Sequence, residues 1–192
     1  MCGRFTLTDA NQVEINLGLQ VVPCFNIAPS QDVLVININL DIGFKKWGIS
    51  PIGHAKKNTL INARLETFKS KPSFRETTKC VVVADGWYEW TKRRKVKVPY
   101  YHYHKDGLLI YFAGLTVQNS GCVIMTCPSG KNIKDIHHRQ PLLLDGPEIK
   151  NWLSNRYYWN EKNAQNVEAR QVSNLVNNPR NDDARNISAV IS

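Results

Sequence analysis

Cys80-Val81-Val82-Val83-Ala84 is a short apolar run rich in β-branched residues, and it ends at the turn residues Asp85-Gly86. A run of this length and composition, bounded by a turn signal, predicts a strand that is buried on both faces. Other short apolar segments, separated by polar turns, occur along the whole chain. The sequence therefore favours a fold whose core is made mainly by strands.

The other predicted strands are equally short. They cover residues 4–7, 33–38, 44–47, 98–104, 108–113, 122–127, 142–144 and 172–176. Asp106-Gly107 separates two of them and predicts a β-hairpin, because Asp-Gly favours tight hairpin turns. Helices are expected to be few and brief. They are one helix capped by Thr8 or Asp9, and segments around residues 64–69, 148–153 and 160–170.

Many strands and few helices, in mixed order, predict an α+β fold. We expect a single domain over residues 1–192, built on a curved, largely antiparallel β-sheet or barrel, with residues 177–192 partly a loop or tail. A chain of 192 residues that is 42% hydrophobic is long enough to bury one such core. No apolar run approaches the roughly 20 residues of a membrane span, so no membrane partner is expected.

The five cysteines, at positions 2, 24, 80, 122 and 127, form an odd set without a C-x-x-C pair. This spacing argues against a disulfide framework and against a zinc site, and it favours a reducing, intracellular compartment. We expect neither a metal nor a cofactor.

The chain is strongly basic, with a formal net charge of +9 and a pI near 9.4. Such an excess favours polyanionic partners, with nucleic acid first. No heptad pattern or obvious apolar surface stripe appears, so we expect a monomer.

Cys2 follows the initiator methionine, which is normally removed when the second side chain is small. Removal of Met1 would leave an α-amine and a thiol on adjacent carbons. The amine can condense with an aldehyde to an imine, and the thiol can then close a thiazolidine ring. An α-amine with a pKa of about 7.7–8.0 is already partly neutral at pH 7. The alternative is that Cys2 is an ordinary residue at a frayed terminus.

Polar residues interrupt three other stretches of the chain. Asn62 follows two apolar residues, where its amide can orient a substrate or cap the next helix. Glu89 lies among aromatic residues, where burial would raise its pKa towards the range useful for proton transfer, unless it pairs with an arginine. His137 belongs to the polar stretch 135–141, which is either an acid–base site or a solvated loop.

Two further segments are interpreted as structural. His102 and His104 alternate on one predicted strand, but two histidines without a third ligand do not make a metal site, so we expect a surface strand. The basic run 92–95 is expected at a hairpin tip, where it can add non-specific attraction to phosphate.

The polar segments resemble, in order, the motifs of the SRAP (SOS response-associated peptidase) family. The matching motifs are Met1-Cys2-Gly3-Arg4-Phe5, Phe25-Asn26-Ile27-Ala28-Pro29, Trp47-Gly48, residues 61–67, residues 84–90, Ile136-His137-x-Arg139-x-Pro141, and Val172-Ser173 with Val176-Asn177-Asn178. The likeness spans nearly the whole chain. It implies that the terminal cysteine forms a covalent thiazolidine with the open-ring aldehyde of an abasic site in single-stranded DNA.

The resemblance also implies a role for each matching residue. Cys2 would be the nucleophile, Asn62 would orient the substrate, Glu89 would shuttle protons, and His137 would assist opening of the deoxyribose ring. The remaining roles would be phosphate contacts by Arg4, Arg64 and Arg139, a DNA-channel wall by Trp90, and a border to the site by Pro29 and Thr126.

The chain departs from the family pattern at three places. Cys24 stands where relatives commonly carry an arginine. The loop after Trp47-Gly48 lacks the bulky tryptophans that serve some relatives as a wedge against the bases, and Ile52 or His54 would be lesser substitutes. His138 replaces an acidic residue, which would alter the pKa of His137.

Three functions stay open on the sequence alone. The first is covalent capture of abasic sites. The second is a terminal-cysteine peptidase that processes its own Met1, as the family name suggests. The third is a non-covalent module for modified or single-stranded DNA, in which Cys2→Ala would leave the affinity almost unchanged.

Overall fold

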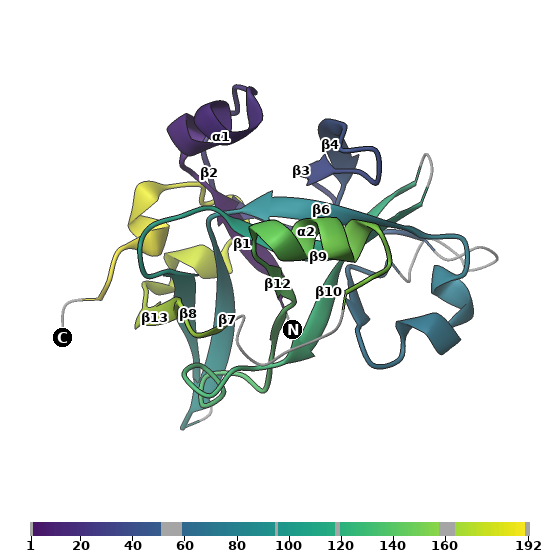
Figure 1. Cartoon of the computed structure of the whole chain (residues 1–192). Helices are drawn as coiled ribbons and strands as arrows, with labels where there is room; N and C mark the ends of the chain where they lie inside the picture. The colour runs from purple at the N-terminus through teal and green to yellow at the C-terminus, as the bar shows by residue number, and fades with distance from the viewer. Residues whose placement is uncertain (1, 51–58, 95, 118–119, 158–163, 191–192) are drawn as a thin grey trace.

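The computed structural model describes residues 2–50, 59–94, 96–117, 120–157 and 164–190. They form two largely antiparallel sheets with a few short helices around them (Figure 1). The predicted α+β class is confirmed. The strands do not close into a barrel, because the larger sheet runs from β11 at one edge to β4 at the other. Within these ranges, no helix is long and apolar enough to cross a membrane.

The smaller sheet has five antiparallel strands and carries the amino-terminal segment near its centre. Its spatial order is β13 (Val167–Gln171), β8 (Val96–His104), β7 (Gly86–Arg93), β1 (Arg4–Leu7) and β2 (Cys24–Ile27). Strand β1 therefore lies between β2 and β7, and Arg4 is opposite Tyr88.

The larger sheet has eight strands and supplies most of the buried aliphatic residues. Its main path is β11 (Arg139–Pro141), β10 (Gly121–Pro128), β9 (Ile110–Val117), β6 (Thr78–Ala84), β3 (Asp32–Ile36) and β4 (Ile42–Lys46). Two short strands join this path from the side, β12 (Leu143–Leu144) on β9 and β5 (Asn62–Arg64) on β10. Strand β5 runs parallel to β10, with Asn62 opposite Ile124.

The helices are short and end at recognisable caps. They are α1 (Ala10–Leu17), α2 (Gly146–Leu153) and the 3-10 turns η1 (Phe68–Ser70), η2 (Pro72–Phe74), η4 (Asn174–Asn177) and η5 (Ala184–Ile187). The Asp9 side chain caps α1 by accepting from the N–H of Gln12 at 3.0 Å. Helix α2 begins with a capping box formed by Asp145 and Glu148.

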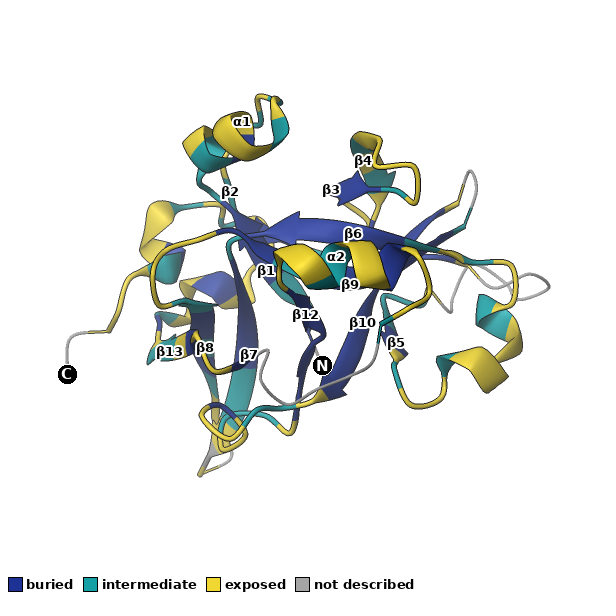
Figure 2. Cartoon of the chain, in the orientation of Figure 1, coloured by how far each residue is buried: buried dark blue, intermediate teal, exposed yellow. Residues whose placement is uncertain are grey.

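The main core lies between the two sheets, where Figure 2 shows buried β1, β6, β7 and β10. Phe5 of β1 packs edge-on against Trp47 and Phe112 of the larger sheet, with ring centroids 5.0 Å and 5.8 Å away. Trp87 of β7 meets the same Phe112 at 6.0 Å. These edge-to-face contacts fix the position of β1, and hence of the residues that precede it.

The hairpin predicted at Asp106-Gly107 is wrong, although the turn itself forms. The N–H of Gly107 donates to the carbonyl of His104 at 2.9 Å. The strands on either side then separate, because β8 pairs with β7 and β13 while β9 pairs with β6, β10 and β12. Residues 92–94 of the basic run lie at the tip of a hairpin formed by β7 and β8, as predicted, and Lys95 is outside the described residues.

Four other local predictions are wrong. Residues 167–170 of the helix predicted around 160–170 belong to strand β13 instead, and residues 160–163 lie outside the described part of the chain. The predicted strand 172–176 gives way to η4. Residues 64–69 end β5 and begin the 3-10 turn η1. His102 is not on a surface strand: it is 1% exposed and stacks on Trp87 at 4.9 Å, and burial lowers its pKa to about 4.

Candidate active site

Cys2 lies two residues before the start of β1 and is fully buried. Its carbonyl oxygen accepts a hydrogen bond of 2.7 Å from the side-chain amide of Asn62, the first residue of β5. This bond joins the segment that leads into β1 of the smaller sheet to β5 of the larger sheet. Burial is also the main reason why the pKa of the Cys2 thiol is raised well above its ordinary value, and the nearby Glu89 carboxylate adds to that rise.

Glu89 reaches the same place from β7. Strands β1 and β7 are antiparallel with Arg4 opposite Tyr88, so the residues before Arg4 run alongside the residues after Tyr88. The Glu89 side chain is buried, and this burial raises its pKa to about 7. The predicted rise in the pKa of Glu89 is confirmed in direction and in cause.

His137 approaches Glu89 from the loop before β11. Its Nδ1 is 3.8 Å from a carboxylate oxygen of Glu89, and it also lies 2.9 Å from the carbonyl oxygen of Arg139. Burial lowers the pKa of His137 below its ordinary value. The exposed His138 packs beside it, with ring centroids 4.5 Å apart.

Cys2, Asn62, Glu89 and His137 therefore converge, and we call them the site cluster. Their sequence positions lie up to 135 residues apart, from 2 to 137. A carboxyl group with a pKa of about 7 beside an imidazole can take up or release a proton near neutrality. The arrangement can therefore support a reaction at Cys2 that requires proton transfers.

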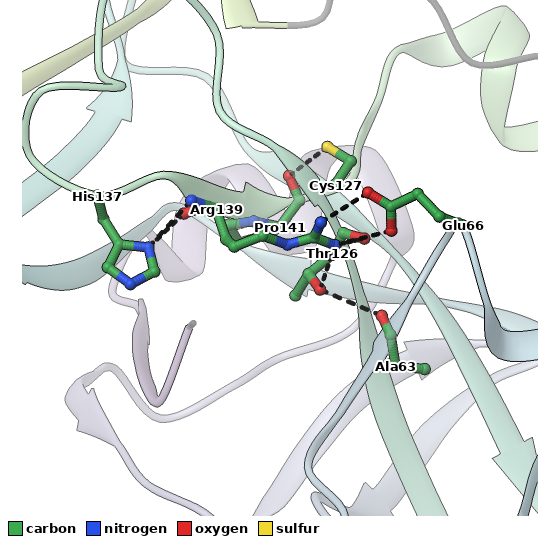
Figure 3. Close-up of polar contacts among 7 residues, drawn as sticks. All are labelled: Ala63, Glu66, Thr126, Cys127, His137, Arg139 and Pro141. Atoms are coloured by element: carbon green, nitrogen blue, oxygen red, sulfur yellow. Dashed lines mark hydrogen bonds and ion pairs between the residues drawn. The ribbon is translucent and has the colours of Figure 1, made fainter.

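Arg139 belongs to a neighbouring group of paired residues. Its guanidinium donates to both carboxylate oxygens of Glu66, at 2.6 Å and 3.1 Å, and to the carbonyl oxygen of Thr126 at 2.6 Å (Figure 3). The hydrogen bond from Arg139 is the main cause that lowers the pKa of Glu66. We call Arg139, Glu66 and Thr126 the Arg139 cluster.

Figure 3 shows that His137 points away from this cluster while its ring stays bonded to the Arg139 backbone. The Thr126 hydroxyl is buried, and it donates to the carbonyl oxygen of Ala63 on β5 at 3.3 Å. The Arg139 cluster thus ties β5, β10 and β11 together beside the site.

Arg4 is held by the carboxyl-terminal part of the chain. Its guanidinium donates to the side-chain oxygen of Asn26 at 2.7 Å and to the carbonyl oxygen of Val176 at 2.8 Å. The indole N–H of Trp90 donates to the side chain of Asn177 at 2.7 Å. The segment around η4 therefore packs against the start of β1.

Of the three arginines that the resemblance assigns to phosphate, Arg64 alone is exposed. It ends β5, two residues after Asn62. Arg139 is 8% exposed, and the guanidinium of Arg4 is occupied as described. Pro29 follows β2 and is half-buried.

Two residues with structural contacts near the site were given no role from the sequence. Asn26 is buried, and its amide nitrogen donates to the carbonyls of Asn178 and Asn181 at 3.0 Å and 2.8 Å. Glu66 is the partner of Arg139. The available signal for Asn26 was a polar residue inside a short apolar strand.

Two observations concern metals and disulfides. Within the described residues, no group of three or more His, Cys, Asp or Glu side chains is placed to hold a metal ion. All five cysteines are free thiols, and four of them are buried.

Comparison with known families matches residues 1–179 to the SOS response associated peptidase (SRAP) family. The chain belongs to the SRAP family. Among curated SRAP relatives, it is 34% identical to the abasic site processing protein YoaM of Bacillus subtilis over 98% of each chain. It is 30% identical to the abasic site processing protein YedK of Escherichia coli, over 80% of this chain and 79% of that one.

The SRAP fold is also found in a solved structure. A protein from Bacteroides thetaiotaomicron superposes with a TM-score of 0.79, covering 99% of this chain and all of that one, at 20% identity. Sequence identity this low supports the shared fold alone.

Proposed function

We propose that this SRAP protein captures abasic sites in single-stranded DNA through Cys2, after removal of Met1. The relatives named above are abasic site processing proteins. The observation that carries the proposal is the convergence at Cys2: Asn62 holds its carbonyl, while Glu89 and His137 lie 3.8 Å apart beside it.

The proposed chemistry has two bond-forming steps. The Cys2 amine attacks the C1′ aldehyde of the open-ring deoxyribose, and the carbinolamine loses water to give an imine. The Cys2 sulfur then adds to the imine carbon, and the thiol proton moves to nitrogen to complete a thiazolidine. The overall change is the loss of one water molecule, with no oxidant or reductant.

The proposed proton transfers use Glu89 and His137. Glu89 in its carboxyl form gives a proton to the departing hydroxyl of the carbinolamine, and in its carboxylate form it accepts one from the amine. His137 assists ring opening of the sugar, and Asn62 keeps the Cys2 backbone in position. Because burial and Glu89 both disfavour the thiolate, we expect the amine to react before the sulfur.

DNA would be held mainly by charge. The chain carries a net charge of +9, and the exposed Arg64 lies two residues after Asn62 on β5. Arg4 and Arg139 would act chiefly by positioning the site, since their guanidinium groups already hydrogen-bond protein oxygens. Trp90 is half-buried and would form part of the channel wall.

Intact mass spectrometry tests the proposal directly. The protein is incubated with a single-stranded oligonucleotide that contains one abasic site, and the expected species is protein without Met1 plus DNA minus one water. Cys2→Ala should abolish this species. Cys24→Ala is the matched control, because Cys24 is a half-buried thiol outside the site cluster, and it should leave the adduct unchanged.

Cys2→Ser separates the two bond-forming steps. This variant keeps the amine and loses the sulfur, so the imine should persist and strand cleavage by β-elimination should follow. A variant that neither traps nor nicks abasic DNA would contradict the imine step. No adduct from correctly processed wild-type protein would favour non-covalent binding, whereas release of Met1 in purified components without aminopeptidase would favour the peptidase.

A further inference from the structure

Strand β4 is a terminal strand of the larger sheet, and β3 is its one strand partner in the described chain. It lies away from the amino terminus, at the top of Figure 1. Its side chains Ile42 and Phe44 are 37% and 55% exposed, which is unusual for large apolar residues on a sheet edge. We propose that this edge pairs with β4 of a second copy of the chain, antiparallel and centred on Gly43, so that the protein forms a dimer instead of the monomer expected from its sequence.

The backbone of β4 has the correct polarity for such pairing. The N–H of Asn37 donates to the carbonyl of Asp41 at 2.9 Å, and the N–H of Trp47 donates to the carbonyl of Gln31 at 2.8 Å. In an antiparallel ladder these bonds alternate, so the odd-numbered residues of β4 bond to β3. Ile42 and Phe44 therefore turn their N–H and C=O groups towards the open edge.

The open edge is short because β10 covers its far end. The N–H of Gly48 donates to the carbonyl of Cys122 at 2.7 Å, and Trp47 forms a bridge to the same residue. Gly121 approaches the carbonyl of Lys46 so closely that a Cβ there would lie 2.6 Å from it. Pairing is thus confined to the part of β4 around Ile42–Phe44.

The sequence of this edge is self-complementary when two copies are centred on Gly43. Ile42 then lies opposite Phe44 of the second copy, and both have outward-facing backbone groups that can exchange hydrogen bonds. Asp41 lies opposite Lys45 of the second copy. Two-fold symmetry repeats each pair, giving two apolar contacts on one face and two ion pairs on the other.

Charge selects this register over its alternatives. Lysines on an edge strand normally discourage pairing, and a parallel arrangement would place Lys45 and Lys46 against themselves. An antiparallel arrangement centred on Phe44 would place Asp41 opposite the buried Trp47. In the Gly43-centred register, the carboxylate of Asp41 from the second copy lies opposite Lys45, so opposite charges meet.

An apolar groove of about 280 Å³ extends the same surface. Phe44 forms one wall, and the other lining side chains include Leu7, Val21, Val22, Ile27 and Leu34. Val22 is 88% exposed at its rim. Ile42 of the second copy would pack beside Phe44 at this groove and cover apolar surface that is otherwise in water.

Charge reversal tests the dimer in solution. By light scattering, the mass of the wild-type protein should rise with concentration from 21.9 kDa towards twice that value, without DNA. Lys45→Asp or Asp41→Lys alone places like charges opposite each other and should keep the protein monomeric. The double variant exchanges the charges and should restore the dimer, an outcome that a merely unfolded single variant would not give.

A cysteine scan tests the register. Gly43→Cys should form a disulfide-linked dimer on oxidation, because Gly43 faces itself across the two-fold axis and a Cβ there meets no atom within 4 Å. Lys46→Cys is the control on the same strand: it faces Leu40 of the second copy, about 20 Å along the strand from its own counterpart, and should not cross-link.

The proposal is overturned by a wild-type mass that stays at 21.9 kDa at every concentration, or by equal cross-linking of the two cysteine variants. It is also overturned if the double charge reversal stays monomeric while folded by circular dichroism. These outcomes are independent of abasic-site capture, because neither experiment contains DNA and β4 contributes no residue to the site cluster.

Discussion

The site cluster and the Arg139 cluster lie side by side, joined through the backbone of Arg139, yet their glutamates behave in opposite ways. Glu66 receives two hydrogen bonds from a guanidinium, and its pKa falls. Glu89 is buried, and its pKa rises to about 7. A carboxylate matched by a cation is fixed as an ion and serves structure. A carboxyl group whose pKa is set by burial can change its protonation state near neutrality, and it can serve chemistry.

The largest effect is expected on the rate of cross-linking, which tests this difference between Glu89 and Glu66. Glu89→Gln keeps the shape of the side chain but removes its proton transfer, so cross-linking should slow by about 100-fold or more at pH 7. Glu66→Gln is the matched control in the other cluster and should leave the rate nearly unchanged. The rates are read from the covalent band on denaturing gels. Equal rates for the two variants would contradict the division of roles.

The next effect concerns stability against pH. Burial raises the pKa of Glu89 from 4.5 to about 7, so the folded protein retains a proton that the unfolded chain releases. That contribution to stability is complete below pH 4.5 and is lost as the pH rises through about 7. Relative to Glu89→Gln, the free energy of wild-type unfolding should fall by about 3 kcal/mol across this window.

Urea denaturation of both proteins at several pH values between these limits measures the difference. If the free energies of unfolding of the two proteins change with pH in parallel, Glu89 has the same pKa in the folded and unfolded chain. Burial would then not prepare it for proton transfer.

A smaller loss of stability should follow from breaking the Arg139 cluster. Arg139→Met leaves the carbonyl of Thr126 and the Glu66 carboxylate without their donor, and Arg139 is buried. Because Glu66 is 43% exposed and water can replace part of the loss, we expect destabilisation of about 2 kcal/mol. Arg64→Met, at an exposed position, should change the urea midpoint little. A larger loss of stability for Arg64→Met than for Arg139→Met would contradict these structural roles.

The smallest effect separates the arginines by their contact with DNA. In a Cys2→Ala background, Arg64→Ala should lower the slope of log affinity against log salt by about 0.7, the loss of one phosphate contact with a single strand. Arg185→Ala is the control, because Arg185 is an exposed arginine that pairs with Asp183. Fluorescence anisotropy with an abasic oligonucleotide measures both slopes. An unchanged slope for Arg64→Ala would remove Arg64 from the DNA interface.

The sequence identified the four residues of the site cluster, but it did not indicate how they meet. Short motifs locate Cys2, Asn62, Glu89 and His137, and the aromatic neighbours of Glu89 indicate its burial. The contact between Asn62 and the Cys2 carbonyl depends on the parallel pairing of β5 with β10, which is a long-range property. A motif likewise cannot show whether an arginine points to solvent, as Arg64 does, or to protein carbonyls, as Arg4 does.

For the fold as well, the sequence predicted local elements better than their long-range pairing. The apolar run 80–84 predicted a buried strand correctly, since its composition leaves little choice. Asp106-Gly107 predicted a turn correctly but not the partners of the flanking strands, because the pairing of β8 and β9 is decided by the two sheets. Residues 167–171 form a strand because they pair antiparallel with β8. This tertiary pairing overrides a weak helical preference.

The anchoring of Arg4 by Val176 and Asn177 has a consequence for the order of events during synthesis. Arg4 leaves the ribosome early, but the carbonyls that fix its guanidinium lie 172 and 173 residues further along the chain. A nascent or truncated polypeptide would carry the aminothiol without the support that orients it. Under the proposed function, competence for covalent reaction would then be acquired only after residues 176 and 177 have been translated, which would spare the cell from reactive fragments.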